Sequence, residues 1–273
     1  MFRKVTDSGG AAAVLWASLI LAACGGGGSG GSSSSGGSDG DTTSLKAGLY
    51  ETKVTYANGA PSQKPVTYFS PTSKFVIVFG GDAGLTFGTF RFSGSSISAT
   101  STDYRQLDPV QPDTDGFFEK RGSQQGVISG TVKSRESAEF STADAEGKIS
   151  TNVEMQRQNL VSGLGISLNR ASGTYVMVDS GGESRVALVV NTDGSLDAQY
   201  SKINCVLAGD LSIPDTSVNV FDVSFTLSSC ATDNRDGEYS GVGFFVPEST
   251  DKGRQLVFAA HNGEVAMKFQ GTR

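Results

Sequence analysis

The chain has 273 residues, with 22 basic and 28 acidic side chains and a formal net charge of −6 at pH 7. This acidic balance argues against a nucleic-acid-binding protein, because such affinity comes largely from Lys and Arg side chains that neutralise phosphates. One histidine and three cysteines leave few side chains for acid–base, thiol or metal chemistry. We therefore expect a protein that is not an enzyme and holds no metal or cofactor, apart from covalent lipid.

Residues 1–23 have the parts of a bacterial lipoprotein signal peptide. Arg3 and Lys4 form a short basic region, and the apolar run that follows is shorter than the roughly 20 residues that a membrane span needs. Leu-Ala-Ala-Cys then ends at Cys24 and has the form of a lipobox. The sequence predicts cleavage before Cys24, which would carry a diacylglyceryl group and an N-acyl chain such as palmitate. The alternative is an ordinary cleaved signal peptide with an incidental cysteine.

Residues 24–44 are expected to be a lipidated tether. Their Gly and Ser composition cannot bury apolar surface, so the segment should be a flexible coil with a reach of roughly 20 Å. Several acyl chains hold a protein durably at a membrane. Gly25 follows the lipobox cysteine, in place of the aspartate that retains some lipoproteins in the inner membrane. We expect an outer-membrane lipoprotein of the cell envelope, either facing the periplasm or exposed on the surface.

Residues 45–168 are expected to form a small antiparallel β-domain, since short apolar segments alternate there with Gly-containing turns. The strands are predicted at residues 46–56, 66–70, 74–79, 85–92, 95–100, 126–132, 138–141 and 148–156. Residues 107–125 are expected to be a long loop. A helix over residues 158–170 is disfavoured because Gly163 and Gly165 interrupt it, and we place the domain boundary near residue 168.

The apolar run from Phe75 to Phe79 is followed closely by Phe87, Phe90 and Phe92. This density exceeds what a strand with one buried face requires. One interpretation is a barrel interior or groove that holds an apolar ligand. The interpretation that we favour is a strand buried on both faces, between two domains.

Residues 169–273 are expected to form a second small β-domain, a sandwich or barrel with an up-and-down meander. Apolar and polar residues alternate from Phe221 to Leu227, a period of two that puts one face in the core. A Pro-containing turn at residues 214–217 and an Asn-Gly pair at residues 262–263 mark hairpins. The fold class predicted for the whole chain is therefore all-β, with two antiparallel β-domains behind the tether.

Cys205 and Cys230 are the two cysteines that remain in the mature chain. An even pair outside the cytoplasm favours a disulfide over a metal site. Antiparallel pairing about the turn at 214–217 would bring the two together at the open end of the hairpin. The bond would close a loop of about 26 residues, which is worth on the order of 3–4 kcal/mol.

Few other residues suggest chemistry. His261 precedes the Asn-Gly turn, so we expect it to be exposed and without a catalytic role. Asp113, Asp115 and the acidic run at residues 233–238 do not have the spacing of a calcium loop, and we interpret them as acidic turns.

Two pairs of segments suggest that the halves are a distant repeat. Ala47–Tyr50 resembles Ser172–Tyr175, and Val127–Val132 resembles Val206–Leu211.

The lipobox, the tether and several of these segments together resemble a group of two-domain, β-rich lipoproteins of proteobacterial outer membranes. The shared segments are residues 47–50, 172–175, 205–230 and 256–273. The Gly-rich tether is also similar to that of surface-exposed barrel lipoproteins that bind transferrin or factor H. The resemblance implies an architecture and a location, and no activity.

Our leading hypothesis is a non-catalytic envelope lipoprotein, anchored in the membrane by lipid, that binds a protein or other host macromolecule or is displayed on the surface. The alternative is a periplasm-facing β-barrel that carries an apolar small molecule. An envelope enzyme is a third, weaker hypothesis.

Overall fold

The computed structural model describes residues 44–80, 83–106, 116–122, 125–144, 146–178, 184–200, 203–248 and 253–273. All of these belong to one compact unit, Asp39–Arg273. The predicted signal peptide, Cys24 and nearly all of the expected tether lie outside the described residues. Within the described part, no helix is both long and apolar enough to cross a membrane.

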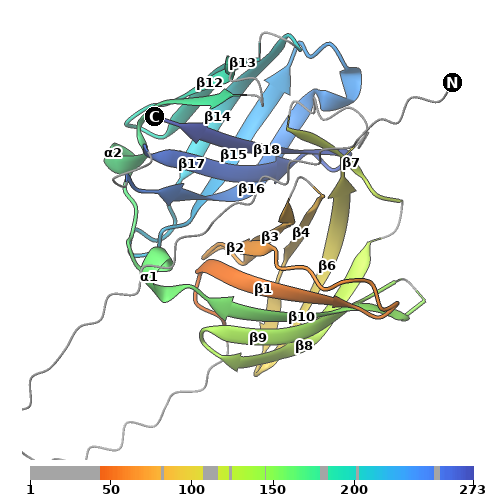
Figure 1. The fold of residues 1–273 in the computed structure, drawn as a ribbon. Coiled ribbons are helices and arrows are strands. Elements are labelled where there is room, and N and C mark those ends of the chain that lie inside the picture. The colour runs from red at the N-terminus through yellow and green to blue at the C-terminus, as the bar shows by residue number, and fades with distance from the viewer. Residues whose placement is uncertain are drawn as a thin grey trace, which may run out of the picture. The chain divides into compact units, whose positions relative to one another are not determined.

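Eight strands of the N-terminal half close into an antiparallel barrel, hereafter barrel 1 (Figure 1). Each strand pairs with the next along the chain, and the last returns to the first. The strands are β1 (Gly48–Tyr56), β2 (Val66–Phe69), β3 (Lys74–Val78), β4 (Leu85–Thr89), β6 (Ser96–Arg105), β8 (Gly126–Ser134), β9 (Ser137–Ala143) and β10 (Ile149–Arg157). A short strand, β5 (Arg91–Ser93), continues the line of β4 along β6.

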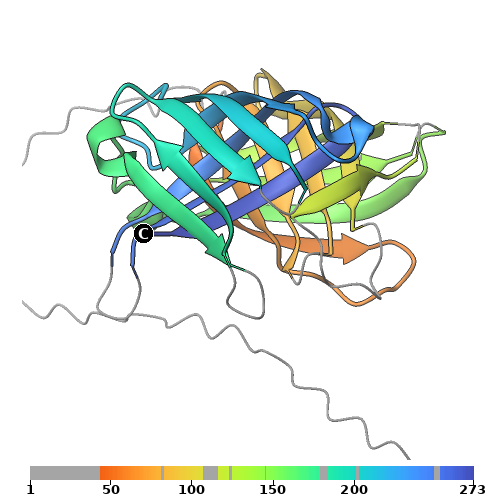
Figure 2. The ribbon, with the colours of Figure 1, turned by 90° about the horizontal axis from the view of Figure 1, so that it is seen from above.

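The C-terminal half forms a second eight-stranded meander, hereafter barrel 2. Seen from above, it lies in front of barrel 1 (Figure 2). Its strands are β11 (Gly173–Val178), β12 (Ser184–Val190), β13 (Ser195–Tyr200), β14 (Cys205–Ser212), β15 (Phe221–Ser228), β16 (Gly237–Val246), β17 (Gln255–His261) and β18 (Val265–Thr272). A single residue pair, Val176 with Thr272, joins β11 to β18. The predicted all-β fold of antiparallel strands is confirmed, and the C-terminal half is a barrel, not a sandwich.

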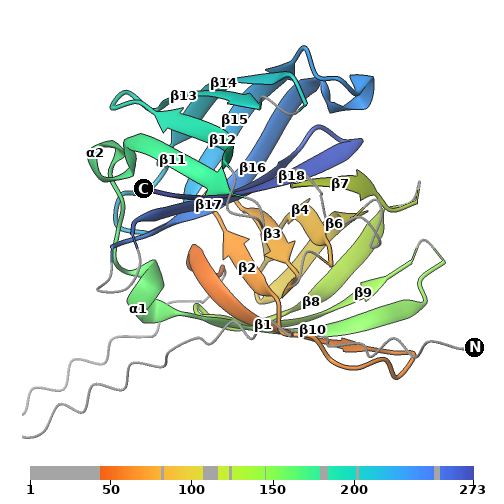
Figure 3. The same ribbon diagram turned by 45° about the horizontal axis from the view of Figure 1, so that its top comes forward.

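One strand joins the two barrels. In β7 (Phe117–Lys120), the last two residues pair with the end of β6, and Phe117 to Glu119 pair with β18 of barrel 2 (Figure 3). The prediction of a continuous loop over residues 107–125 is therefore wrong at these four residues. So short a strand has no periodicity to reveal it. It forms because β18 has backbone groups that the end of β11 leaves unpaired.

The segment between the barrels contains two single-turn helices, α1 (Asn159–Ser162) and α2 (Leu168–Ala171). The expectation of no helix over residues 158–170 is thus wrong in part. Gly163 does end α1, as the sequence suggested, so neither helix extends beyond one turn. The boundary that we placed near residue 168 falls between β10 and β11.

Apolar side chains gather in three clusters, one inside each barrel and one between the barrels. Strand β3 contributes to two of them. Phe75 and Ile77 lie inside barrel 1, whereas Val76 lies between the barrels. The favoured interpretation of this apolar run, a strand buried on both faces, is correct.

Candidate functional site

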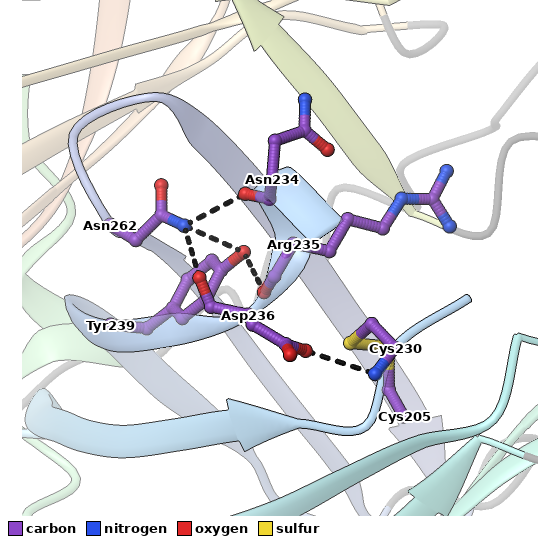
Figure 4. Close-up of a disulfide and its surroundings, with 7 residues drawn as sticks. All are labelled: Cys205, Cys230, Asn234, Arg235, Asp236, Tyr239 and Asn262. Carbon is purple, nitrogen blue, oxygen red and sulfur yellow. Dashed lines mark hydrogen bonds between the residues drawn. A yellow bond between two sulfur atoms is a disulfide. The ribbon is translucent and has the colours of Figure 1, made fainter. Parts of the chain in front are cut away.

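The structure contains the predicted disulfide between Cys205 and Cys230 (Figure 4). Cys205 begins β14, and Cys230 follows the end of β15 by two residues. The register that pairs Val206 with Ser228 brings the two Cα atoms to 4.1 Å. The bond closes the open end of this hairpin, as antiparallel pairing predicted, and its role is structural.

The acidic run after Cys230 is a folded turn (Figure 4). The Asp236 carboxylate accepts a hydrogen bond of 2.9 Å from the backbone N–H of Cys230, and the Tyr239 hydroxyl donates to the Arg235 carbonyl at 2.9 Å. Asn262 donates to the carbonyl of Asp236. The polar groups of this turn thus stabilise the loop beside the disulfide. Of the residues described, no three or more His, Cys, Asp or Glu form a group that could hold a metal ion; Asp113 and Asp115 lie outside them.

His261 lies between the barrels, so the expectation of an exposed residue at a hairpin tip is wrong. Its Nδ1 is 3.2 Å from the Tyr104 hydroxyl of barrel 1, and its ring centroid is 4.7 Å from that of Phe87. Burial lowers the pKa of His261, and the positive charges of Lys74 and Lys120 lower it further. The sequence could not place this residue, because the surface that covers it comes from another barrel.

A groove of about 510 Å³ runs beside His261, where barrel 1 meets barrel 2. Its base is the outer face of β3, β4, β6 and β8, and its far wall is formed by β16 and β17. Apolar groups are contributed by Phe87, Val127 and Val242, among others. Hydroxyl and amide groups are contributed by Thr89, Ser98, Thr100, Thr102, Gln125 and Ser240.

The charged residues of the groove are basic. Lys74 pairs with Thr89 across β3 and β4, and Arg91 follows Thr89 by two residues on the same face. Diagonal neighbours of this kind are typically about 7–8 Å apart. Among the residues described, neither cation forms an ion pair, and no carboxylate lines the groove. This is an uncompensated positive site on an acidic protein.

A second groove, of about 450 Å³, lies over β1, β9 and β10 and has a different charge pattern. Lys53 bonds Glu154 at 2.9 Å, and Lys133 bonds Glu139 at 2.8 Å. Its charges largely neutralise one another. The groove between the barrels is therefore the better candidate for a ligand site.

Lys74 and Arg91 were not among the site residues predicted from the sequence. Each flanks a phenylalanine-rich strand, at a position whose side chain points away from the barrel interior. The alternation of inward and outward side chains along a strand could have predicted this, since Phe75, Phe90 and Phe92 occupy the inward positions. No pattern in the sequence predicts that β16 and β17 of barrel 2 lie beside this face and turn it into a groove.

Comparisons with known proteins are uninformative about function. No family model matches the chain, and no curated protein sequence matches it. One solved structure, "Aeromonas veronii immune modulator A", is similar over 85% of this chain and 97% of its own, with 13% sequence identity and a TM-score of 0.35. A TM-score of this size supports no argument about the chain.

Proposed function

We propose that the protein is a non-catalytic binding module, held at the outer membrane by lipid on Cys24. The observation that carries this proposal is a lipobox cysteine and a Gly/Ser tether placed before two barrels that present a groove at their junction. The tether would let the groove meet a macromolecule at a distance from the bilayer.

Filled barrel interiors favour binding at the surface over carriage of an apolar small molecule inside a barrel. The interior of barrel 1 is occupied by aromatic and aliphatic side chains, including Tyr50, Phe69, Phe75 and Phe140, each at most 3% exposed. The interior of barrel 2 is similarly occupied by Tyr175, Phe221, Phe258 and Phe269. Close-packed interiors of this kind leave few voids larger than a water molecule.

The surroundings of His261 support a role without catalysis. Among the residues described, its one hydrogen-bond partner is Tyr104. Burial raises the pKa of Tyr104 to about 12, so its phenol remains protonated near neutral pH. Nucleophilic catalysis needs a base that is oriented by a third group and contacts a nucleophile, and this pair lacks that arrangement.

The anchor is tested by Cys24→Ala in cells that are given labelled palmitate. Wild-type protein should incorporate the label and sediment with outer membranes, whereas Cys24→Ala should do neither. Gly25→Asp is the matched control, because it keeps the acylated cysteine and should move the labelled protein to the inner membrane. Sedimentation of unlabelled Cys24→Ala with membranes would contradict the proposal.

Orientation is tested with protease added to intact cells. Surface display requires loss of the protein from intact cells. Protection in intact cells and loss only after permeabilisation would show that the binding module faces the periplasm.

A further inference from the structure

The groove between the barrels has features that specify a class of ligand. From them we infer that the groove binds an anionic saccharide, with a sulfate, phosphate or carboxylate group held between Lys74 and Arg91. The inference rests on the proposed binding function and adds to it the chemistry of the ligand.

The cations supply the first argument. Lys74 and Arg91 project from adjacent strands on one face, with the Thr89 hydroxyl between them in the register. Two like charges at this spacing repel each other, and no carboxylate of the described residues lies in the groove to offset them. A bound anion removes the repulsion and accepts charge-assisted hydrogen bonds from both side chains.

The hydroxyl-rich face supplies the second argument. Beyond the cations, the wall and base carry the side chains of Thr89, Ser98, Thr100, Thr102, Gln125 and Ser240. Hydroxyl and amide groups both donate and accept hydrogen bonds. This dual capacity matches the hydroxyl groups of a sugar ring, each of which also donates and accepts.

The strand pairing argues against an acidic peptide that binds as an added strand. Such a peptide needs a sheet edge with unpaired backbone groups. In the groove, β4 is paired with β3 on one side and β6 on the other. Strand β6 is flanked by β4 and β5 on one side and by β8 and β7 on the other. Recognition in the groove therefore depends on side chains.

The size of the groove suits a short saccharide segment. Its volume of about 510 Å³ lies within the range of roughly 300–1,000 Å³ that is typical of small-ligand sites. The side chain of Val127, which is 46% exposed, provides apolar surface for the less polar face of a sugar ring.

The test is titration calorimetry of the purified full-length lipoprotein in non-ionic detergent at low salt. The probes are sucrose octasulfate, neutral sucrose and a hexaglutamate peptide. We expect the octasulfate to bind and to weaken as salt is raised, whereas sucrose and hexaglutamate should bind at least tenfold more weakly.

Variants locate the site. The double variant Lys74→Gln with Arg91→Gln should weaken octasulfate binding at least tenfold. The charge-preserving exchange Lys74→Arg with Arg91→Lys should stay within about threefold of wild type. The matched control, Lys64→Gln with Lys148→Gln, removes two exposed lysines outside the groove and should leave binding unchanged. Unchanged thermal melting of each variant shows that the fold persists.

Three results would overturn the inference. Absence of octasulfate binding would show that the groove is not an anion site. An equal loss of octasulfate affinity in the Lys64/Lys148 control would show that the ligand is attracted by general surface charge. Hexaglutamate binding as tight as that of the octasulfate shows a peptide site in place of a saccharide site. None of these results alters the membrane fractionation of the Cys24 variants. Failure of the saccharide site can therefore be distinguished from failure of the proposed lipid anchor.

Discussion

The two barrels begin alike. In barrel 1, the Tyr50 hydroxyl donates to the Lys46 carbonyl at 2.5 Å, and Arg157 at the end of β10 donates to the Ala47 carbonyl at 2.9 Å. Gly48 has a φ of +149°, and a Cβ there would lie 2.8 Å from the Arg157 Nε. The Oγ and Cβ of Ser162 in α1 would lie nearer still, at 2.5 and 2.7 Å. Glycine is therefore favoured by this backbone conformation and by the two side chains, Ser162 and Arg157, that cover the start of the first strand.

Barrel 2 repeats this arrangement. The Tyr175 hydroxyl donates to the Ala171 carbonyl at 2.8 Å, and Arg273 donates to the Ser172 carbonyl across Gly173, whose φ is +138°. The predicted similarity of the segments that begin the two barrels is thus matched in three dimensions. The other predicted pair is not, because Val127–Val132 lies on the sixth strand of barrel 1 and Val206–Leu211 on the fourth of barrel 2.

The barrels differ in how they close. Seven residue pairs join β1 to β10 in barrel 1, whereas one pair joins β11 to β18 in barrel 2. Barrel 2 instead uses β7 beside β18 and a disulfide between β14 and the loop after β15. Barrel 1 thus closes through its own backbone, whereas barrel 2 depends on a strand from the other half of the sequence.

The largest expected effect comes from Phe117→Ala. Phe117 is 1% exposed and packs in the core of barrel 2, although it belongs to the N-terminal half of the chain. Loss of a buried phenylalanine should lower the free energy of unfolding by about 3–5 kcal/mol. Hydrogen exchange should show the loss of protection first in β11 and β18. The control is Phe92→Ala, which truncates a half-buried side chain of barrel 1. If the Phe117 variant lost hydrogen-exchange protection only in barrel 1, the dependence of barrel 2 on β7 would be contradicted.

Removal of the disulfide should have a similar or slightly smaller effect. Cys205→Ser with Cys230→Ser opens a loop with a sequence separation of 25 residues, and we expect a loss of about 3–4 kcal/mol. Denaturant unfolding, followed by hydrogen exchange, should show destabilisation in barrel 2 and little change in barrel 1. Reductant should shift the wild-type transition to that of the variant and leave the variant unchanged. A shift of the variant by reductant would show that the effect has another cause.

Asp222→Ala tests the contact between the barrels. Asp222 of β15 is 7% exposed, and its carboxylate accepts hydrogen bonds from Ser70 at 2.5 Å and Thr72 at 2.7 Å, both in barrel 1. Hydrogen bonds to a charged group are worth about 1.5–3 kcal/mol, so unfolding should require roughly that much less free energy. Asp222→Asn keeps one acceptor and should cost less. Equal losses for the two variants would show that the carboxylate charge dominates the contact.

The smallest effect should be the pH dependence due to His261. Its pKa is lowered in the folded protein, so the unfolded chain, with a pKa near 6.5, binds the proton more readily. The contribution of His261 to the free energy of unfolding is therefore fully present above pH 6.5. It decreases as the pH falls from 6.5 to the pKa of His261 in the folded protein, and it is constant below that pKa. His261→Gln should remove this slope from the unfolding free energy between pH 7 and pH 5. An unchanged slope would assign it to other groups.

Much of the fold was predictable from the sequence because it depends on neighbours along the chain. Apolar and polar residues alternate from Phe221 to Leu227, and a turn at residues 214–217 precedes this strand. The two features together predict the hairpin of β14 and β15, because these strands pair with each other directly across the turn. The same local geometry places Cys205 near Cys230. The apolar density of residues 75–79 likewise predicted burial on both faces of β3.

The tertiary structure alone decided what lies between the barrels. The alternation of β15 assigns Asp222 to the outer face, and only the packing of barrel 1 against that face makes the residue buried. The same packing covers His261, gives β7 its second partner and turns the face that carries Lys74 and Arg91 into a groove. A period-two pattern specifies which side chains point out of a barrel. Whether they meet solvent or a second barrel depends on contacts between residues far apart in the sequence.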